Sequence, residues 1–133
     1  MNKIIFLFII VPLSLIRMDS FDVMMVALRF NEKINERNLE GLAELMAEDH
    51  AFVDSDGTVT KGKTVMKDVW AKFFDLYPDY RNVFTSVTVQ GNVVVMVGYS
   101  TCSYKPLNGP TMWTAKVHGG RVSEWRVYWL DHR

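Results

Sequence analysis

The sequence predicts an α+β domain in which three N-terminal helices pack on a curved, mainly antiparallel sheet. Helical periodicity dominates the first half of the chain, and alternating β-branched and aromatic residues dominate the second half. The pairs Gly91-Asn92 and Gly119-Gly120 separate such runs at the spacing of tight hairpins. A length of 133 residues, 49% of them hydrophobic, suits one ordinary domain with its own core.

Residues 1–17 are predicted to be an apolar leader, and residues 18–133 a single domain. Residues 4–16 look like the apolar part of a secretory signal, but no small-residue cleavage motif follows, and they are shorter than the roughly 20 residues that span a bilayer. An export signal, a short membrane anchor and an upstream start in a gene whose working start is Met18 all fit this pattern. We expect a cytoplasmic protein if it starts at Met18, and an exported or membrane-tethered one if the leader is used. Membrane contact is expected only through residues 4–16, if they are retained.

Apolar residues at helical spacing predict the first two helices. The first is expected over residues 21–36, with Asp19 or Ser20 as its N-cap. Asn38 is expected to cap a second helix that runs to about Met46.

A short strand over residues 50–54 follows in the predicted order. The Asp-Gly turn at residues 56–57 should let residues 58–60 pair back onto that strand. A third helix is expected to begin after Gly62 and to end at Pro78. Four further strands are expected over about 80–90, 93–103, 111–118 and 121–130, with a longer loop over 104–110.

Composition argues against several classes of function. Fifteen basic and fifteen acidic side chains cancel, and no basic stripe with interleaved aromatic residues is present, so we expect no nucleic-acid partner. Cys102 is the single cysteine, which excludes an internal disulfide and a cysteine-rich zinc site. His50, His118 and His132 lack metal-ligand spacing. We therefore expect neither a metal site nor a cofactor.

Asp54 is the first candidate catalytic residue, because strand alternation places it on the same face as Phe52. A carboxylate held against apolar walls loses hydration, and this loss raises its pKa towards the range that is useful for proton transfer near neutral pH. His50 is the second candidate, two residues earlier on that face and roughly 6.5 to 7 Å along the strand. An alternative remains open for each residue: Asp54 caps the following turn, and His50 lies at the open rim of the sheet.

Seven aromatic residues are candidates for contact with a flat, apolar ligand, since together they would form a wide wall. They are Phe30, Phe52, Trp70, Phe73, Tyr99, Trp113 and Trp129. Two alternatives stay open for them, plain core packing and burial in a dimer interface. Arg126 and Tyr128 alternate to the other face of the last strand and are candidates for such an interface.

The order and spacing of three segments resemble the nuclear-transport-factor-2-like superfamily, in its SnoaL-like and ketosteroid-isomerase-like branch. These segments are residues 30–57, the helix that follows Gly62, and the closing run of residues 120–129, and the likeness covers nearly all of residues 20–131. The resemblance implies a cystatin-like cone, in which the sheet wraps around a helix and leaves an apolar cavity. It also implies a homodimer formed through the outer face of the sheet.

The resemblance further implies a role for Asp54, which falls where the steroid isomerases of this family keep their general base. Phe30 and Trp113 fall where those enzymes keep the two donors of their oxyanion hole. Loss of one such donor typically lowers the rate by about a hundredfold to a thousandfold, so we do not expect steroid isomerisation. The arginine flanked by two aspartates of the family's epoxide hydrolases has no counterpart that we can place.

Two classes of function follow. The first is a SnoaL-like lyase or isomerase, of cyclase or dehydratase type, in which one cavity carboxylate acts as acid or base on a small apolar or aromatic substrate. The second is a non-catalytic ligand-binding or dimerisation module of the same fold.

Overall fold

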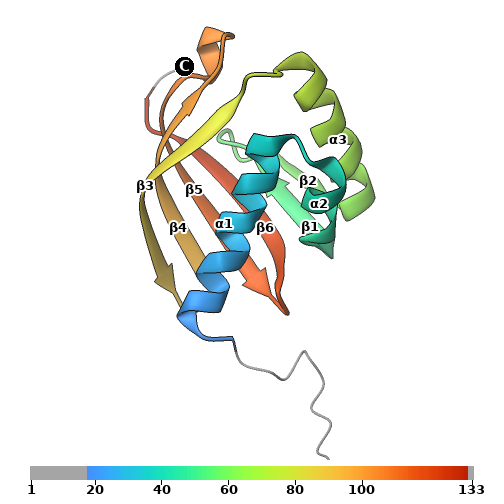
Figure 1. The fold of residues 1–133 in the computed structure, drawn as a ribbon, viewed down its shortest axis with the longest axis vertical. Coiled ribbons are helices and arrows are strands. Elements are labelled where there is room, and N and C mark those ends of the chain that lie inside the picture. The colour runs from blue at the N-terminus through green and yellow to red at the C-terminus, as the bar shows by residue number, and fades with distance from the viewer. Residues whose placement is uncertain (1–17, 132–133) are drawn as a thin grey trace, which may run out of the picture.

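A computed structural model describes residues 18–131, and the predicted leader over residues 1–17 lies outside the described residues. Figure 1 shows helices packed against a single six-stranded sheet. The elements are α1 (Ser20–Glu36), α2 (Leu39–Glu44), β1 (Met46–Val53), β2 (Val59–Lys61), α3 (Lys63–Leu76), β3 (Arg81–Gln90), β4 (Val93–Thr101), the 3-10 helix η2 (Lys105–Leu107), β5 (Gly109–His118) and β6 (Arg121–Trp129). Within residues 18–131, no helix is long and apolar enough to cross a membrane.

The strands lie in the order β2-β1-β6-β5-β4-β3, and every neighbouring pair is antiparallel except β1 with β6. Helix α1 lies across the inner face against β3 to β6, while α3 covers β1 and β2 (Figure 1). This arrangement confirms the predicted α+β architecture and the mainly antiparallel sheet. A pocket lies between α3 and the strands of the sheet.

Helix α1 begins and ends where the sequence indicated. Asp19 is the N-cap, and its carboxylate accepts a hydrogen bond of 2.8 Å from the backbone N–H of Asp22. At the other end Arg37 adopts a left-handed conformation with φ of 57°, and its N–H donates to the carbonyl of Ile34 at 3.1 Å. This end has the bonding pattern of a Schellman motif, although the left-handed residue is not a glycine.

The boundary between α2 and β1 differs from the prediction. Helix α2 ends at Glu44, and β1 already begins at Met46, four residues before the predicted start at His50. The reason is tertiary, because Met46 pairs in parallel with Val122 of β6, and the Val122 N–H donates to the Leu45 carbonyl at 2.7 Å. A contact between residues so far apart in sequence is invisible to local periodicity.

The later elements follow the prediction closely. Helix α3 starts after Gly62, whose φ of 106° suits glycine, and it ends before Pro78. The predicted loop over residues 104–110 contains η2, and β5 begins inside it at Gly109. Both predicted hairpins are present, joining β3 to β4 and β5 to β6.

Candidate functional site

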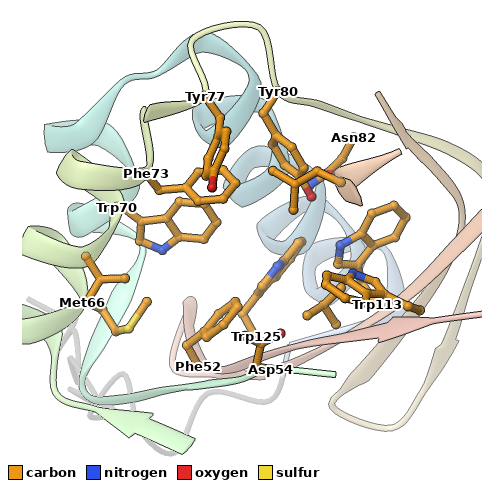
Figure 2. A pocket seen from close by; sticks show the side chains of 14 residues that line it. Phe52, Asp54, Met66, Trp70, Phe73, Tyr77, Tyr80, Asn82, Trp113 and Trp125 are labelled. Atoms are coloured by element: carbon orange, nitrogen blue, oxygen red, sulfur yellow. The ribbon is translucent and has the colours of Figure 1, made fainter. Parts of the chain in front are cut away.

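A pocket of about 290 Å³ opens between α3 and the inner face of the sheet (Figure 2). This volume is at the lower end of the roughly 300–1,000 Å³ typical of small-molecule sites, and about twice that of a cavity that holds benzene, roughly 150 Å³. One or two fused rings would therefore fill it. The lining residues are Phe52, Asp54, Met66, Val69, Trp70, Phe73, Tyr77, Tyr80, Asn82, Leu107, Trp113, Trp125, Val127 and Trp129.

The helix side of the pocket is built from one aromatic stripe of α3. Trp70 packs edge to face against Phe73 of the same stripe, with ring centroids 5.5 Å apart. Trp70 also meets Phe52 of β1 edge to face, at 6.0 Å between ring centroids. These contacts hold each ring in the geometry that aromatic pairs prefer, so the wall is preformed.

The sheet side carries three tryptophans on two neighbouring strands. Trp113 of β5 is 1% exposed and packs against Phe84 of β3, with ring centroids 5.1 Å apart. Trp125 and Trp129 come from β6, where alternation turns both toward the interior. The pocket is thus a slot between aromatic side chains, which suits a flat ligand.

Asp54 lines this pocket at the point where β1 ends. Its Oδ1 accepts a hydrogen bond of 2.7 Å from the N–H of Ser55. Its backbone closes the following turn, because the Asp54 N–H donates to Thr58 and the Asp54 carbonyl accepts from Gly57, both at 2.9 Å. The Asp54 side chain therefore lines the pocket and also accepts a hydrogen bond within the following turn.

The electrostatics of the pocket are simple. Among the described residues that line it, Asp54 is the only carboxylate, and no lysine, arginine or histidine joins it. Asp56, in the same turn, points elsewhere: its Oδ1 accepts from the Thr58 N–H at 2.9 Å, and this bond lowers the pKa of Asp56. Asp54 is therefore the one side chain among these lining residues that carries a negative charge at neutral pH.

His50 lies on the same strand face as Asp54, but it does not line the pocket or the sheet rim. Its ring is fully buried, 5.6 Å from the Phe30 ring between centroids, and its Nδ1 lies 2.7 Å from the carbonyl oxygen of Val122. A carbonyl only accepts, so Nδ1 carries the proton in the neutral ring. Burial lowers the pKa of His50, while the bond to Val122 opposes that shift.

Phe30 and Tyr99 also lie away from the pocket lining. Phe30 belongs to the buried face of α1 and packs against Trp125, with ring centroids 4.7 Å apart. Tyr99 is 43% exposed, because the buried Met96 and Ser100 of the same strand occupy the inner face. The remaining predicted ligand contacts, at Phe52, Trp70, Phe73, Trp113 and Trp129, are brought together in the pocket wall.

Eight lining residues were not among the predicted site residues, namely Met66, Val69, Tyr77, Tyr80, Asn82, Leu107, Trp125 and Val127. Asn82 offered a signal, because it is a polar residue that alternation places on the same strand face as Phe84. The two tyrosines belong to the connection between α3 and β3, whose path depends on tertiary contacts.

Arg37 supplies those tertiary contacts. Its guanidinium donates to the backbone carbonyl of Tyr80 and to that of Tyr77 at 3.5 Å, and also to the carbonyl of Asn35 at 2.6 Å. The end of α1 is thereby tied to the segment that roofs the pocket. Arg37 positions this roof without lining the pocket itself.

The family model for the SnoaL-like domain matches residues 27–127, from within α1 through most of β6. The chain belongs to the SnoaL-like family. The match includes every residue of the pocket except Trp129. No curated protein sequence matches this SnoaL-like protein significantly.

Solved structures share the fold of this SnoaL-like protein at low sequence identity. A Kribbella flavida protein assigned as a ketosteroid isomerase aligns with a TM-score of 0.72 and 20% identity, covering 86% of this chain and 82% of the other. A Shewanella putrefaciens protein assigned as a SnoaL-like polyketide cyclase gives 0.72 and 15%, covering 94% and 92%. An epoxide hydrolase of M. tuberculosis gives 0.73 and 12%, covering 83% and 84%. At these identities the likeness establishes the fold.

Proposed function

We propose that this protein is a small-molecule lyase or isomerase, of cyclase or dehydratase type, in which Asp54 acts as general base on an apolar or aromatic substrate. The observation that carries the proposal is the placement of one carboxylate in the lining of an otherwise aromatic slot. Family membership supports the class of fold, and the pocket supports the size and flatness of the substrate.

Asp54 would take a proton from a carbon atom next to an electron-withdrawing group such as a carbonyl. The electron pair of that C–H bond moves into the carbonyl to give an enolate, and the carboxylate becomes a carboxylic acid. Return of the proton to a different carbon completes an isomerisation. Loss of a leaving group from the neighbouring carbon, which takes the proton with it, completes an elimination.

Two features narrow the substrate. The side chain of Phe30 offers no hydrogen-bond donor and lies outside the pocket, so no oxyanion donor acts from that position. His50 is likewise outside the lining, so Asp54 works without it as a partner. The substrate should therefore have C–H bonds that are already acidic, as in a ketone whose adjacent carbon is also benzylic.

A non-catalytic ligand carrier is the second candidate, and one observation favours it. The bond from the Ser55 N–H to Oδ1 of Asp54 gives the carboxylate a local structural role. A carrier would bind the same flat ligands and leave their C–H bonds intact. The two candidates therefore differ in chemistry and agree in binding.

The deciding experiment follows hydrogen exchange in β-tetralone, a fused aromatic ring and cyclic ketone with benzylic protons beside its carbonyl. In deuterium oxide, the wild-type protein should speed the replacement of those protons, as measured by proton NMR. Asp54→Asn should lower this rate by about a hundredfold or more, because general-base catalysis supplies 10²–10⁴-fold. The amide oxygen can still accept the Ser55 N–H bond, so the turn should persist.

Asp56→Asn is the matched control, since it changes a carboxylate in the same turn that bonds Thr58 and does not line the pocket. Its exchange rate should equal that of the wild type. Binding of β-tetralone without any acceleration of exchange by the wild type would support the carrier and reject the enzyme. Equal rates for wild type and Asp54→Asn would remove Asp54 from the chemistry.

A further inference from the structure

Two buried polar atoms in the pocket wall have no hydrogen-bond partner among the described residues. They are Nε1 of Trp70 and Oδ1 of Asn82. The two side chains are 6% and 3% exposed, so bulk water does not satisfy these atoms. Buried polar groups in native proteins are nearly always paired, so each of these two atoms needs a partner that the described residues do not supply.

The two atoms are of opposite kind. The indole Nε1–H of Trp70 is only a donor, and the amide oxygen of Asn82 is only an acceptor. Figure 2 shows the two side chains on opposite sides of the pocket, with Trp70 coming from α3 and Asn82 from the start of β3. A ligand that satisfies both must therefore present an acceptor at one end and a donor at the other.

Asn82 is held in place by α1. Its backbone N–H donates to Oδ1 of Asn35 at 2.9 Å, and its backbone carbonyl accepts from Nδ2 of Asn35 at 2.9 Å. Its own Nδ2 donates to Oδ1 of Asn31 at 3.1 Å. These three bonds fix both the backbone and the amide plane, so Oδ1 cannot turn away to find another partner.

Trp70 is held by rings rather than by hydrogen bonds. Phe52, Phe73 and Phe74 pack around it, with ring centroids 6.0, 5.5 and 5.6 Å away. In Figure 2 the nitrogen-bearing edge of the indole faces the side of the pocket formed by Met66 and Phe52. Rotation of the ring would break these contacts, so the N–H direction is set by packing.

We propose that the ligand of this pocket is a one- or two-ring compound with a carbonyl oxygen that accepts from Trp70 Nε1–H and a hydroxyl group that donates to Asn82 Oδ1. This inference rests on the proposed function only in taking the same pocket as the ligand site. It adds a donor from α3 that polarises the carbonyl of the bound substrate, at a position where the family resemblance implied no donor. Trp70 would then stabilise the enolate oxygen that forms when Asp54 removes a proton.

The test compares three ligands that differ only in polar groups: tetralin, β-tetralone and a ring-hydroxylated β-tetralone. Wild-type affinity, measured by quenching of tryptophan fluorescence, should rise in that order by roughly threefold to tenfold per group. Trp70→Phe should abolish the preference for β-tetralone over tetralin, because it removes the donor and keeps an aromatic ring. Trp129→Phe, on the sheet side, should lower the affinities for tetralin and β-tetralone by the same factor and so preserve the ratio of the two affinities. An unchanged ratio in Trp70→Phe, or a wild type that binds tetralin as tightly as β-tetralone, would overturn the proposal.

A second measurement needs no variant. In a nitrogen–proton correlation spectrum, the indole resonance of Trp70, assigned through its contacts with Phe52 and Phe73, should move downfield with β-tetralone and not with tetralin. A shift of equal size with both ligands, or binding of neither, would contradict the hydrogen bond. Asp54→Asn should keep the preference for β-tetralone over tetralin. The binding proposal can therefore hold even if Asp54 proves not to be catalytic.

Discussion

The ring of His50 is a buried ionisable group next to the core residue Phe30, and its charge state affects folding. Burial lowers its pKa from the ordinary value of 6.5 in the folded protein. Below pH 6.5 the unfolded chain takes up a proton that the folded protein refuses until the pH reaches its lower pKa. The unfolded state binds more protons in this window, so stability falls as the pH falls.

Replacement of His50 should flatten this dependence. In His50→Asn the amide nitrogen can still donate to the Val122 carbonyl, but no group titrates. Urea unfolding measured from pH 7 to pH 5 should show a smaller loss of free energy than in the wild type, by at most about 1.4 kcal/mol per pH unit for one proton. An identical slope in both proteins would mean that His50 is not the group responsible.

The sequence predicted which residues share a strand face, because alternation decides this. It did not predict which of those residues line the pocket and which are covered by a helix. Alternation placed Asp54 and Phe52 on one common face of the strand, and both line the pocket. The same rule placed His50 on that face, yet α1 covers it, and Phe30 fills the space beside it. Which inward residues meet a ligand depends on where the helix crosses the sheet, and local spacing does not contain that information.

At the scale of elements, the joint between α1 and the pocket roof depends on Arg37. Its backbone lies in the left-handed region, with φ of 57°, where a side chain other than glycine costs about 1 kcal/mol. Its guanidinium offsets that strain through hydrogen bonds to the backbone carbonyls of Tyr77 and Tyr80. Arg37 therefore makes two opposing contributions to stability: its backbone strain is unfavourable, and its hydrogen bonds between the helix end and the pocket roof are favourable.

Substitution by alanine and by glycine should separate these contributions. Arg37→Ala loses the guanidinium bonds and keeps the strain, so we expect a loss of about 2 kcal/mol in urea unfolding. Arg37→Gly loses the same bonds but relieves the backbone, so it should be more stable than Arg37→Ala by about 1 kcal/mol. Both variants should bind β-tetralone equally weakly, since the roof is loosened in each. Wild-type affinity in either variant would show that the roof does not need Arg37.

Boundaries between elements were predictable where the signal is local. Asp19, Gly62 and Pro78 mark helix ends through capping and backbone restrictions, and the structure has helix ends at these places. The early start of β1 at Met46 was missed because it depends on parallel pairing with Val122. Parallel strands are joined by long connections rather than by tight turns, so the sequence between them carries no turn motif that would indicate the pairing.

At the scale of the whole molecule, the outer face of the sheet carries an apolar row. Val97, Met112 and Tyr128 are cross-strand neighbours on β4, β5 and β6, and each is half-buried. The Arg126 guanidinium lies 4.7 Å from the Tyr128 ring centroid, and the exposed Tyr99 lies on β4 nearby. We propose that this face forms a homodimer, since aromatic residues and arginine are enriched at interfaces.

Sedimentation velocity tests the dimer directly. The wild type should sediment as a dimer at micromolar concentration, and Tyr99→Asp should shift it to the monomer by placing a charge in the interface. Leu76→Asp is the matched control, because Leu76 is 70% exposed at the end of α3, away from this face. A monomeric wild type would reject the proposal, and so would dissociation in the control alone.

The fold as a whole was predictable because its hairpins, caps and helical stripes all indicate the same architecture. Function was not equally predictable, because one fold can host several chemistries, which depend on the residues of the site rather than on the fold. Two polar groups of the pocket, Trp70 Nε1 and Asn82 Oδ1, become candidates only when their burial and lack of partners are known.

In the proposed function, a flat ring ketone lies in the aromatic slot with its acidic carbon next to Asp54. The most direct measurement is a crystal structure of the Asp54→Asn variant with bound β-tetralone, because this variant should bind the ketone without exchanging its protons. The rings should lie between Trp70 and Trp113, with the benzylic carbon beside the carbonyl facing the side chain at position 54. A ligand bound outside the slot, or one whose benzylic carbon faces away from position 54, would contradict it.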